Sequence, residues 1–198
     1  MKKIDLNWYK DSSVTTVAKS LLGKSLCTNF DGQLVKGKIV ETEAYSGEND
    51  KACHANNQRK TARNKVMFEG GGAAYIYLCY GIHHLFNVVT NIKGKADAVL
   101  IRALEPMEGV EMMLARRNMT KFEKRLTAGP GVLTQALGIK TTHYGEKMNG
   151  RNIWIEEGDT LPVEDIVVTT RIGVEYAEED ALKPWRFYIK ENKWVSRY

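Results

Sequence analysis

The chain has 198 residues, and Lys and Arg exceed Asp and Glu by 29 to 24, which gives a formal net charge of +5 at pH 7. This length suits one domain that can bury a core, so we expect a single domain over residues 1–198. The basic balance favours an anionic partner without identifying it. The three cysteines, without CxxC spacing, argue against a disulfide framework and against a zinc cluster.

The sequence carries no segment typical of export or of a membrane span. Asp5 lies where a signal peptide needs an apolar run. The most apolar stretch, residues 73–89, is interrupted by Gly81, by two histidines and by Asn87. We therefore expect a soluble cytoplasmic protein without membrane contact, associated with the nucleoid if the source is bacterial.

The first part of the chain predicts a helix followed by a strand. Apolar residues recur at helical spacing over residues 14–21. Residues that can cap and stop this helix flank it: Asp11, Ser12, Ser13 and Gly23. Residues 34–45 are rich in β-branched side chains and lack proline, so they predict a strand. Its period of two places four side chains on one face: Ile39, Glu41, Glu43 and Tyr45.

The middle of the chain predicts a β-hairpin and a buried strand. Residues 74–79 and 84–90 have strand character and are separated by a short turn, which places Tyr80 near the tip of a hairpin. Residues 98–104 predict a central strand buried on both faces and ended by Pro106. A basic loop precedes the hairpin and carries four cationic side chains: Arg59, Lys60, Arg63 and Lys65.

The remaining elements complete the predicted fold class. Residues 110–117 predict a helix, and residues 132–137 predict a short helix whose amino-terminal amides are free to face an anion. Short strands are predicted at residues 153–155, 166–170 and 187–189. Together these elements predict a mixed α/β (α+β) domain with a central antiparallel sheet, flanking helices and a protruding hairpin.

The strand over residues 34–45 carries the main candidates for catalysis, although carboxylates on strands are usually only solvated. Glu41 and Glu43 are predicted to share a face with Tyr45, and His54 follows nine residues later. A base that activates water beside a flat aromatic slot suits hydrolysis of a planar heterocycle. Spacing alone does not choose between the two carboxylates.

Aromatic and charged residues in the hairpin and the buried strand need an explanation. Tyr75 and Tyr77 fit a core, but Tyr80 at a hairpin tip suits insertion between base steps of a duplex. Arg102 lies in an apolar strand and needs an acidic partner, because an unpaired buried charge is costly. Glu41 and Glu105 are the candidates for this salt bridge.

Two other classes of function stay open on the residues alone. A binding module without activity would use the basic loop and the hairpin to hold DNA or RNA. A metal-dependent hydrolase would need ligands at tight spacing, and the available side chains lack it: Cys53, His54, His83, His84 and His143. We therefore expect no metal site. The glycines at residues 70–72 do not continue into a phosphate-binding loop either.

Ordered motifs over most of the chain resemble the alkyladenine (3-methyladenine) DNA glycosylase family. They are Ala18-Lys19-Ser20-Leu21-Leu22-Gly23-Lys24, Ile39-Val40-Glu41-Thr42-Glu43-Ala44-Tyr45, Arg63-Asn64 with Met67-Phe68, Tyr75-Ile76-Tyr77, Tyr80-Gly81 before Asn87, Leu100-Ile101-Arg102-Ala103-Leu104-Glu105-Pro106, Gly129-Pro130 with residues 133–137, Arg171-Ile172-Gly173-Val174, and Lys183-Pro184-Trp185-Arg186-Phe187-Tyr188. The chain departs from mammalian members at Ile82-His83-His84 and in the loop after Gly70.

The resemblance implies a reaction and a catalytic general base. It implies a monofunctional glycosylase that flips alkylated or deaminated purines out of duplex DNA and hydrolyses the N-glycosidic bond with water. Glu43 would deprotonate this water, Arg102 would help place both, and Glu41 would be supporting structure. Because water and not a lysine attacks, no Schiff base and no strand cleavage follow, and neither a metal nor an organic cofactor is required. A monomer suffices.

The resemblance also implies which residues bind the base and the DNA. Tyr45 would stack on one face of the flipped base, with His54 and Tyr77 against the other. Asn87 would reject bases with a misplaced exocyclic amine, and Tyr80 would fill the gap in the duplex. Three residues of the basic loop are expected to contact the DNA backbone: Arg59, Arg63 and Lys65.

Overall fold

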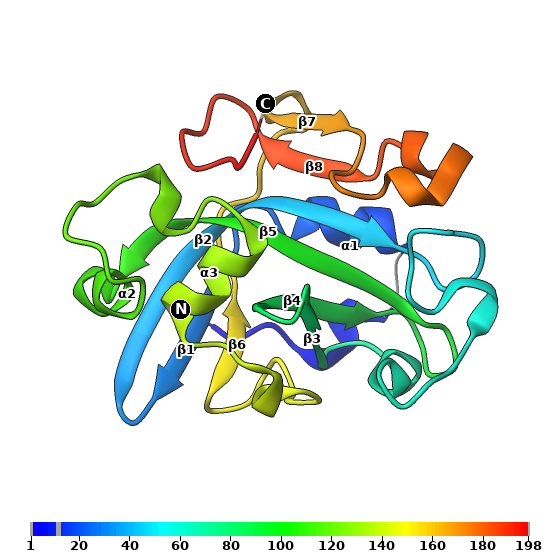
Figure 1. The fold of residues 1–198 in the computed structure, drawn as a ribbon, viewed down its shortest axis with the longest axis horizontal. Helices are drawn as coiled ribbons and strands as arrows, with labels where there is room; N and C mark the ends of the chain where they lie inside the picture. Colours follow the sequence, from blue (N-terminus) through cyan, green and yellow to red (C-terminus); the bar gives the residue numbers. More distant parts are fainter. Residues whose placement is uncertain (1, 11–12, 198) are drawn as a thin grey trace.

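The computed structural model describes residues 2–10 and 13–197 (Figure 1). Within these ranges, eight strands form one antiparallel sheet in the order β3-β4-β5-β2-β1-β6, with β8 paired to both β2 and β7. The strands are β1 (Ser25–Phe30), β2 (Gln33–Tyr45), β3 (Ala74–Cys79), β4 (His83–Thr90), β5 (Asp97–Glu108), β6 (Ile153–Glu156), β7 (Ile166–Thr169) and β8 (Arg186–Ile189). The predicted mixed α/β class with a central antiparallel sheet is confirmed.

Helices flank this sheet. The α-helices in the described part are α1 (Val14–Ser20), α2 (Val110–Arg116) and α3 (Pro130–Leu137). In Figure 1, α3 lies next to β4 and β5 and α2 packs on α3, whereas α1 packs on β2. Short 3-10 helices span Leu6–Tyr9, Asn56–Gln58, Lys65–Phe68, Lys124–Leu126, Thr141–His143, Val163–Asp165 and Glu175–Leu182. None of the helices in residues 2–10 and 13–197 has the length and apolar character that crossing a bilayer would require.

The predicted first helix is confirmed, and it begins at a capping serine. The Ser13 hydroxyl accepts a hydrogen bond from the Thr16 amide at 3.3 Å, which satisfies one of the free amides of the first turn. The other predicted caps, Asp11 and Ser12, lie outside the described residues. On the sheet side, the Thr42 hydroxyl of β2 donates to the Ala18 carbonyl at 2.9 Å. This contact fixes α1 on the face of β2 that bears Thr42.

Strand β2 is the centre of the sheet. One edge of β2 pairs with β5, while the other pairs first with β1 and then with β8. Register shifts on both sides of Glu41 mark a bulge, so the alternation predicted from Ile39 to Tyr45 is interrupted there. Glu43 lies between Leu100 of β5 and Arg186 of β8. Both edges of the strand are therefore hydrogen-bonded where Glu43 projects.

Strand β5 is longer than the sequence predicts. Residues 98–104 lie in it as expected, but it runs from Asp97 to Glu108, so the prediction that Pro106 ends the strand is wrong. Pro106 pairs with Gly37 at a register shift in β2, and β4 pairs with β5 only as far as Leu100. Proline lacks one backbone donor, and this loss is tolerated where the strand has a single partner and an irregular register.

The predicted hairpin of β3 and β4 is confirmed. Tyr75 pairs with Asn87, and Cys79 pairs with His83 at the end of the ladder. Tyr80 in the turn has a φ of +50°, in the left-handed region that non-glycine residues rarely adopt. The Tyr80 side chain is 92% exposed. A large aromatic ring thus stands in solvent on a strained turn.

Candidate active site

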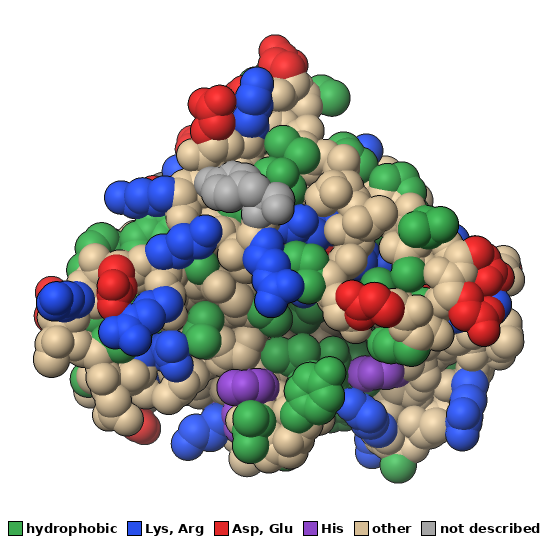
Figure 2. Space-filling view, turned by 45° about the horizontal axis from the view of Figure 1, so that its top comes forward, with side chains coloured by type: hydrophobic (Ala, Val, Ile, Leu, Met, Phe, Trp, Pro, Cys, Tyr) green, Lys and Arg blue, Asp and Glu red, His purple; other side chains and the backbone are tan. Residues whose placement is uncertain are grey.

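A cleft of about 620 Å³ opens between the β3–β4 hairpin, strands β2 and β5, and the segment that follows β7. Of the site residues predicted from the sequence, these line it: Tyr45, His54, Arg63, Tyr77, Tyr80, Asn87 and Arg102. Figure 2 shows a hollow on one face of the molecule, with hydrophobic side chains inside it and histidine, Lys and Arg side chains around it. The structure therefore brings distant parts of the chain together.

Glu43 lies behind the cleft and touches three groups that line it. Its side chain is fully buried. One oxygen, Oε2, accepts the Tyr45 hydroxyl at 2.7 Å and lies 3.2 Å from an Nη atom of Arg102. The other, Oε1, accepts the backbone amide of Ile172 at 2.8 Å. The carboxylate is thus held by one phenol, one guanidinium and one main-chain amide.

Glu41 has a different set of neighbours. Its Oε1 accepts from Nε of Arg102 at 3.0 Å, from Nε of Arg186 at 2.8 Å and from the Ser196 hydroxyl at 2.9 Å. Its Oε2 accepts the Ser196 amide at 2.7 Å. Burial opposes ionisation of Glu41, but the Arg102 charge, the Ser196 amide and Arg186 outweigh it, so the pKa lies below its ordinary value. Glu41 thus accepts four hydrogen bonds and links Arg102 to Arg186.

Arg102 bridges the two carboxylates from β5. Only 7% of Arg102 is exposed, and its Nε and Nη groups face Glu41 and Glu43 respectively. Burial opposes the charge of Arg102, but the two carboxylates more than compensate, so the pKa of the guanidinium lies above its ordinary value. The expected salt bridge with Glu41 is confirmed. Glu105, the other candidate, accepts instead from Asn192 at 3.0 Å.

An aromatic group forms one wall of the cleft. Nδ1 of His54 lies 2.7 Å from the Tyr75 hydroxyl, and the His54 ring meets Tyr77 edge to face at 4.6 Å between centroids. Partial burial, aided by the charge of Arg63, lowers the pKa of His54 from 6.5 to about 4. The imidazole is therefore neutral near pH 7. Asn87 lies beside this group and donates to the Tyr75 carbonyl at 3.1 Å.

Tyr45 stands at the end of β2. Burial, together with the nearby Glu43 carboxylate, raises the pKa of Tyr45 well above its ordinary value of 10.0. The phenol therefore keeps its proton and acts as a donor to Glu43. Tyr45 and the group of His54 and Tyr77 both line the cleft.

The predicted basic residues divide into two groups. Arg63 lines the cleft, and its guanidinium lies 4.9 Å from the centroid of the Tyr77 ring. Arg59 and Lys65 are exposed but do not line the cleft. The basic pattern in the sequence predicted the same role for all three residues. It could not show that Arg63 contacts Tyr77 in the cleft while Arg59 and Lys65 do not line it.

One group that contacts Glu43 was not among the predicted site residues. The Ile172 amide belongs to the main chain, so no side-chain pattern could reveal it. The sequence signal for it is the family motif Arg171-Ile172-Gly173-Val174, which does not by itself indicate that a main-chain amide contacts Glu43. Gly173 and Tyr176 of the same region also line the cleft.

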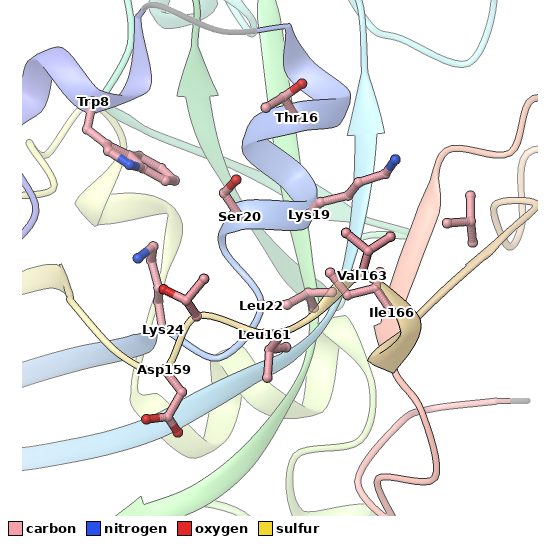
Figure 3. Close-up of a pocket in the computed structure, with 12 residues that line it drawn as sticks. Trp8, Thr16, Lys19, Ser20, Leu22, Lys24, Asp159, Leu161, Val163 and Ile166 are labelled. Carbon is pink, nitrogen blue, oxygen red and sulfur yellow. The ribbon is translucent and has the colours of Figure 1, made fainter.

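A second cavity, of about 460 Å³, lies elsewhere in the fold (Figure 3). Side chains of α1 and of residues 159–168 line it, among them Lys19, Ser20 and Leu161. None of the predicted site residues lies there. Within the described part of the chain, no cluster of three or more His, Cys, Asp or Glu side chains has the arrangement of a metal site.

Known proteins match this chain over nearly its whole length. The family model described as methylpurine-DNA glycosylase (MPG) matches residues 7–193. Three similar bacterial proteins share the name "Putative 3-methyladenine DNA glycosylase". The one from Clostridium tetani is 46% identical over 98% of this chain and 99% of its own length. The one from Carboxydothermus hydrogenoformans is 49% identical over 93% of this chain and 94% of its own length. The one from Clostridium botulinum is 44% identical over 98% of this chain and 98% of its own length.

These matches confirm the resemblance drawn from the motifs. The matched residues include both glutamates of β2, the hairpin and the segment that contacts Glu43. The chain therefore belongs to the methylpurine-DNA glycosylase family and is a DNA glycosylase, a hydrolase of N-glycosidic bonds.

Proposed function

We propose that the protein flips alkylated or deaminated purines out of duplex DNA and hydrolyses their N-glycosidic bond with a water that Glu43 deprotonates. The substrates would include 3-methyladenine, 7-methylguanine, hypoxanthine and ethenoadenine. The product is an abasic site, as in base excision repair. Residues 1–198 would act as one monomeric domain without a metal or an organic cofactor.

The placement of Glu43 carries the proposal. A carboxylate has roughly four acceptor positions. Glu41 uses that capacity on Arg102, Arg186 and Ser196. Among the described residues, Oε1 of Glu43 has the Ile172 amide as its donor, which leaves a position for a water proton. This difference supports Glu43 as the base and Glu41 as structure.

Because the Glu43 side chain is completely covered, water would reach it only after neighbouring groups move. The groups that touch it and line the cleft are Tyr45, Arg102 and Ile172. A flipped purine that stacks on Tyr45 would lie next to these groups and therefore close to Glu43. The deprotonated water oxygen then bonds to the sugar carbon C1′, and the electron pair of the N-glycosidic bond leaves with the purine.

The walls of the cleft suit a purine. Tyr45, His54 and Tyr77 all line the cleft, and His54 meets Tyr77 edge to face, so these rings would offer aromatic surfaces on which a base could stack. A base with a positive charge is attracted to the electron-rich faces of tyrosines. His54 is uncharged near pH 7 because its pKa lies at about 4, so it does not repel such a base. Flipping also costs less for a damaged or mispaired base, which adds selectivity.

Substitution of Glu43 by Gln tests the proposal. A duplex that carries one hypoxanthine or ethenoadenine is incubated with each protein, then treated with alkali to cut at abasic sites. We expect Glu43→Gln to keep binding the lesion but to lose base release, since the amide cannot take a proton from water. Without alkali, the wild-type product should remain an unbroken strand.

The control is Glu105→Gln, because Glu105 is bonded to Asn192 and does not line the cleft. This variant should release the base at the wild-type rate. Normal turnover by Glu43→Gln would remove Glu43 as the base. Failure of the wild-type protein on separate duplexes that carry 3-methyladenine, 7-methylguanine, hypoxanthine or ethenoadenine would overturn the proposed substrate class.

A further inference from the structure

A buried ion pair lies beside the proposed base without contacting it directly. Arg171, in the segment after β7, and Asp50, in the loop after β2, have fully buried side chains. The two nitrogens of the Arg171 fork meet the two Asp50 oxygens at 2.6 and 2.7 Å. A planar two-point contact of this kind fixes direction as well as distance. The pair thus joins two loops that are far apart in the sequence.

Further bonds extend this pair into both loops. The Arg171 fork also donates to the Ala44 carbonyl of β2 and to the Asp180 carbonyl, each at 2.9 Å. Asp50 accepts the amides of Ser46 at 3.3 Å and Ala52 at 3.1 Å. The chain on both sides of Tyr45 is therefore tied to one guanidinium.

Two of the three groups that hold Glu43 are in contact with Arg171 or adjacent to it. The Arg171 guanidinium lies 4.8 Å from the centroid of the Tyr45 ring, and the Tyr45 hydroxyl donates to Oε2 of Glu43. Ile172 follows Arg171 directly in the chain, and its amide donates to Oε1. Only Arg102, the third group, is held from β5.

The environment of Arg171 is not the one that stability alone favours. Its Nε is buried without a hydrogen-bond partner in the described part of the chain. The guanidinium lies 4.8 Å from the centroid of the Tyr45 ring and 5.3 Å from that of Trp185. A buried donor without an acceptor costs free energy, and a buried ion pair is frequently no more stable than apolar residues of the same size. What the arrangement secures is the position of the Tyr45 ring.

We propose that Arg171 and Asp50 form a positioning pair for the glycosylase reaction: the pair sets the two hydrogen bonds that orient the Glu43 carboxylate toward its water. The inference rests on the proposed role of Glu43. Loss of the pair would let the Tyr45 ring and the Ile172 amide shift relative to Glu43. A displacement of about 1 Å at a reacting group lowers a rate by about 100-fold.

Asp50→Asn and Arg171→Lys test this proposal. Asn keeps the shape of Asp but loses its charge, and Lys keeps the charge of Arg but loses the planar fork. We expect each variant to release the base about 10- to 100-fold more slowly in single-turnover reactions, per folded molecule. The dissociation constant for the lesion duplex should change less than about threefold, because the walls of the cleft remain.

A purely structural pair would give a different result. The matched control is Glu156→Gln, which breaks the largely buried Lys36–Glu156 ion pair at 2.5 Å, away from the cleft. All three variants should unfold at lower temperature than the wild type. Only the two variants at the positioning pair should release the base more slowly than the wild type when the rate is expressed per folded molecule. Wild-type release by folded Asp50→Asn and Arg171→Lys would overturn the inference.

The same assay separates this inference from the proposed function. If Glu43→Gln also released the base normally, the role of Glu43 itself would be wrong. If Glu43→Gln abolished release while both variants of the pair released it at the wild-type rate, only the positioning role would fail.

Discussion

Two glutamates of one strand, Glu41 and Glu43, share a single arginine but have different neighbours. Glu41 is fixed by Arg102, Arg186 and Ser196. Its loss would leave two buried guanidinium groups with one nearby counter-charge fewer, which is strongly destabilising. Substitutions of Glu41 are therefore expected to lower the folded fraction, which makes them unsuitable as controls for Glu43. The two carboxylates therefore differ in their environment and not in residue type.

The ionisation of His54 predicts a pH dependence of stability. Its pKa is about 4 in the folded protein against 6.5 as the ordinary value. Between these two pH values the unfolded chain binds a proton that the folded ring does not. The contribution of His54 to stability therefore falls as pH drops through this window and does not change above it. His54→Gln should lose less stability than the wild type over the same window.

Urea unfolding across this pH range provides the measurement. His83→Gln, at an exposed position of the hairpin, controls for the removal of a histidine as such. Equal pH slopes for the wild type and His54→Gln would show that the folded ring takes its proton as readily as the unfolded one.

Some residues of the site follow from the sequence and others do not. The position of Arg102 in an apolar strand predicted a salt bridge with an acidic residue, because a buried charge needs a partner. The preference for Glu43 over Glu41 as the proposed base needed the family resemblance, since both lie on one strand. The Arg171–Asp50 pair spans 121 positions of the chain, and no local pattern connects its two members.

At the scale of elements, the β3–β4 hairpin carries the most direct prediction about DNA. Tyr80 is 92% exposed at its tip, beside the cleft. If the ring fills the space of the flipped base, Tyr80→Ala should weaken binding to a lesion duplex and slow release by about tenfold or more, with the fold unchanged. Fluorescence anisotropy and single-turnover release measure the two effects.

The control removes an exposed aromatic ring elsewhere. Phe122, which is 53% exposed and packs on Trp194, does not line the cleft. Phe122→Ala should bind the duplex as the wild type does. An unchanged affinity of Tyr80→Ala would remove Tyr80 as the inserting residue.

The elements themselves were largely predictable, for physical reasons. The hairpin, α1 and the tail strands follow local periodicity and turn residues, which the final fold respects. Pro106 misled the prediction of β5 because the sequence does not reveal where a strand lacks a second neighbour. The pairing of β8 with β2 beside Glu43 is also invisible in local patterns, since it joins distant segments.

At the scale of the whole molecule, the net charge of +5 predicts a binding that salt weakens. The logarithm of the affinity for duplex DNA should fall with the logarithm of salt concentration by roughly 0.9 per phosphate neutralised. Arg59→Gln should reduce this slope by about one unit if its side chain contacts a phosphate. Arg151→Gln, at an exposed position before β6, provides the comparison. A flat salt dependence of the wild type would contradict a backbone contact.

The strained turn of the hairpin has a consequence for laboratory evolution of this protein. A non-glycine residue in the left-handed conformation costs about 1–2 kcal/mol, and Tyr80 has a φ of +50° while its ring gains nothing from burial. Glycine or asparagine would be the lower-energy choice there. Selection for heat resistance alone would therefore discard Tyr80, whereas selection for lesion removal would retain it if the ring inserts into the duplex.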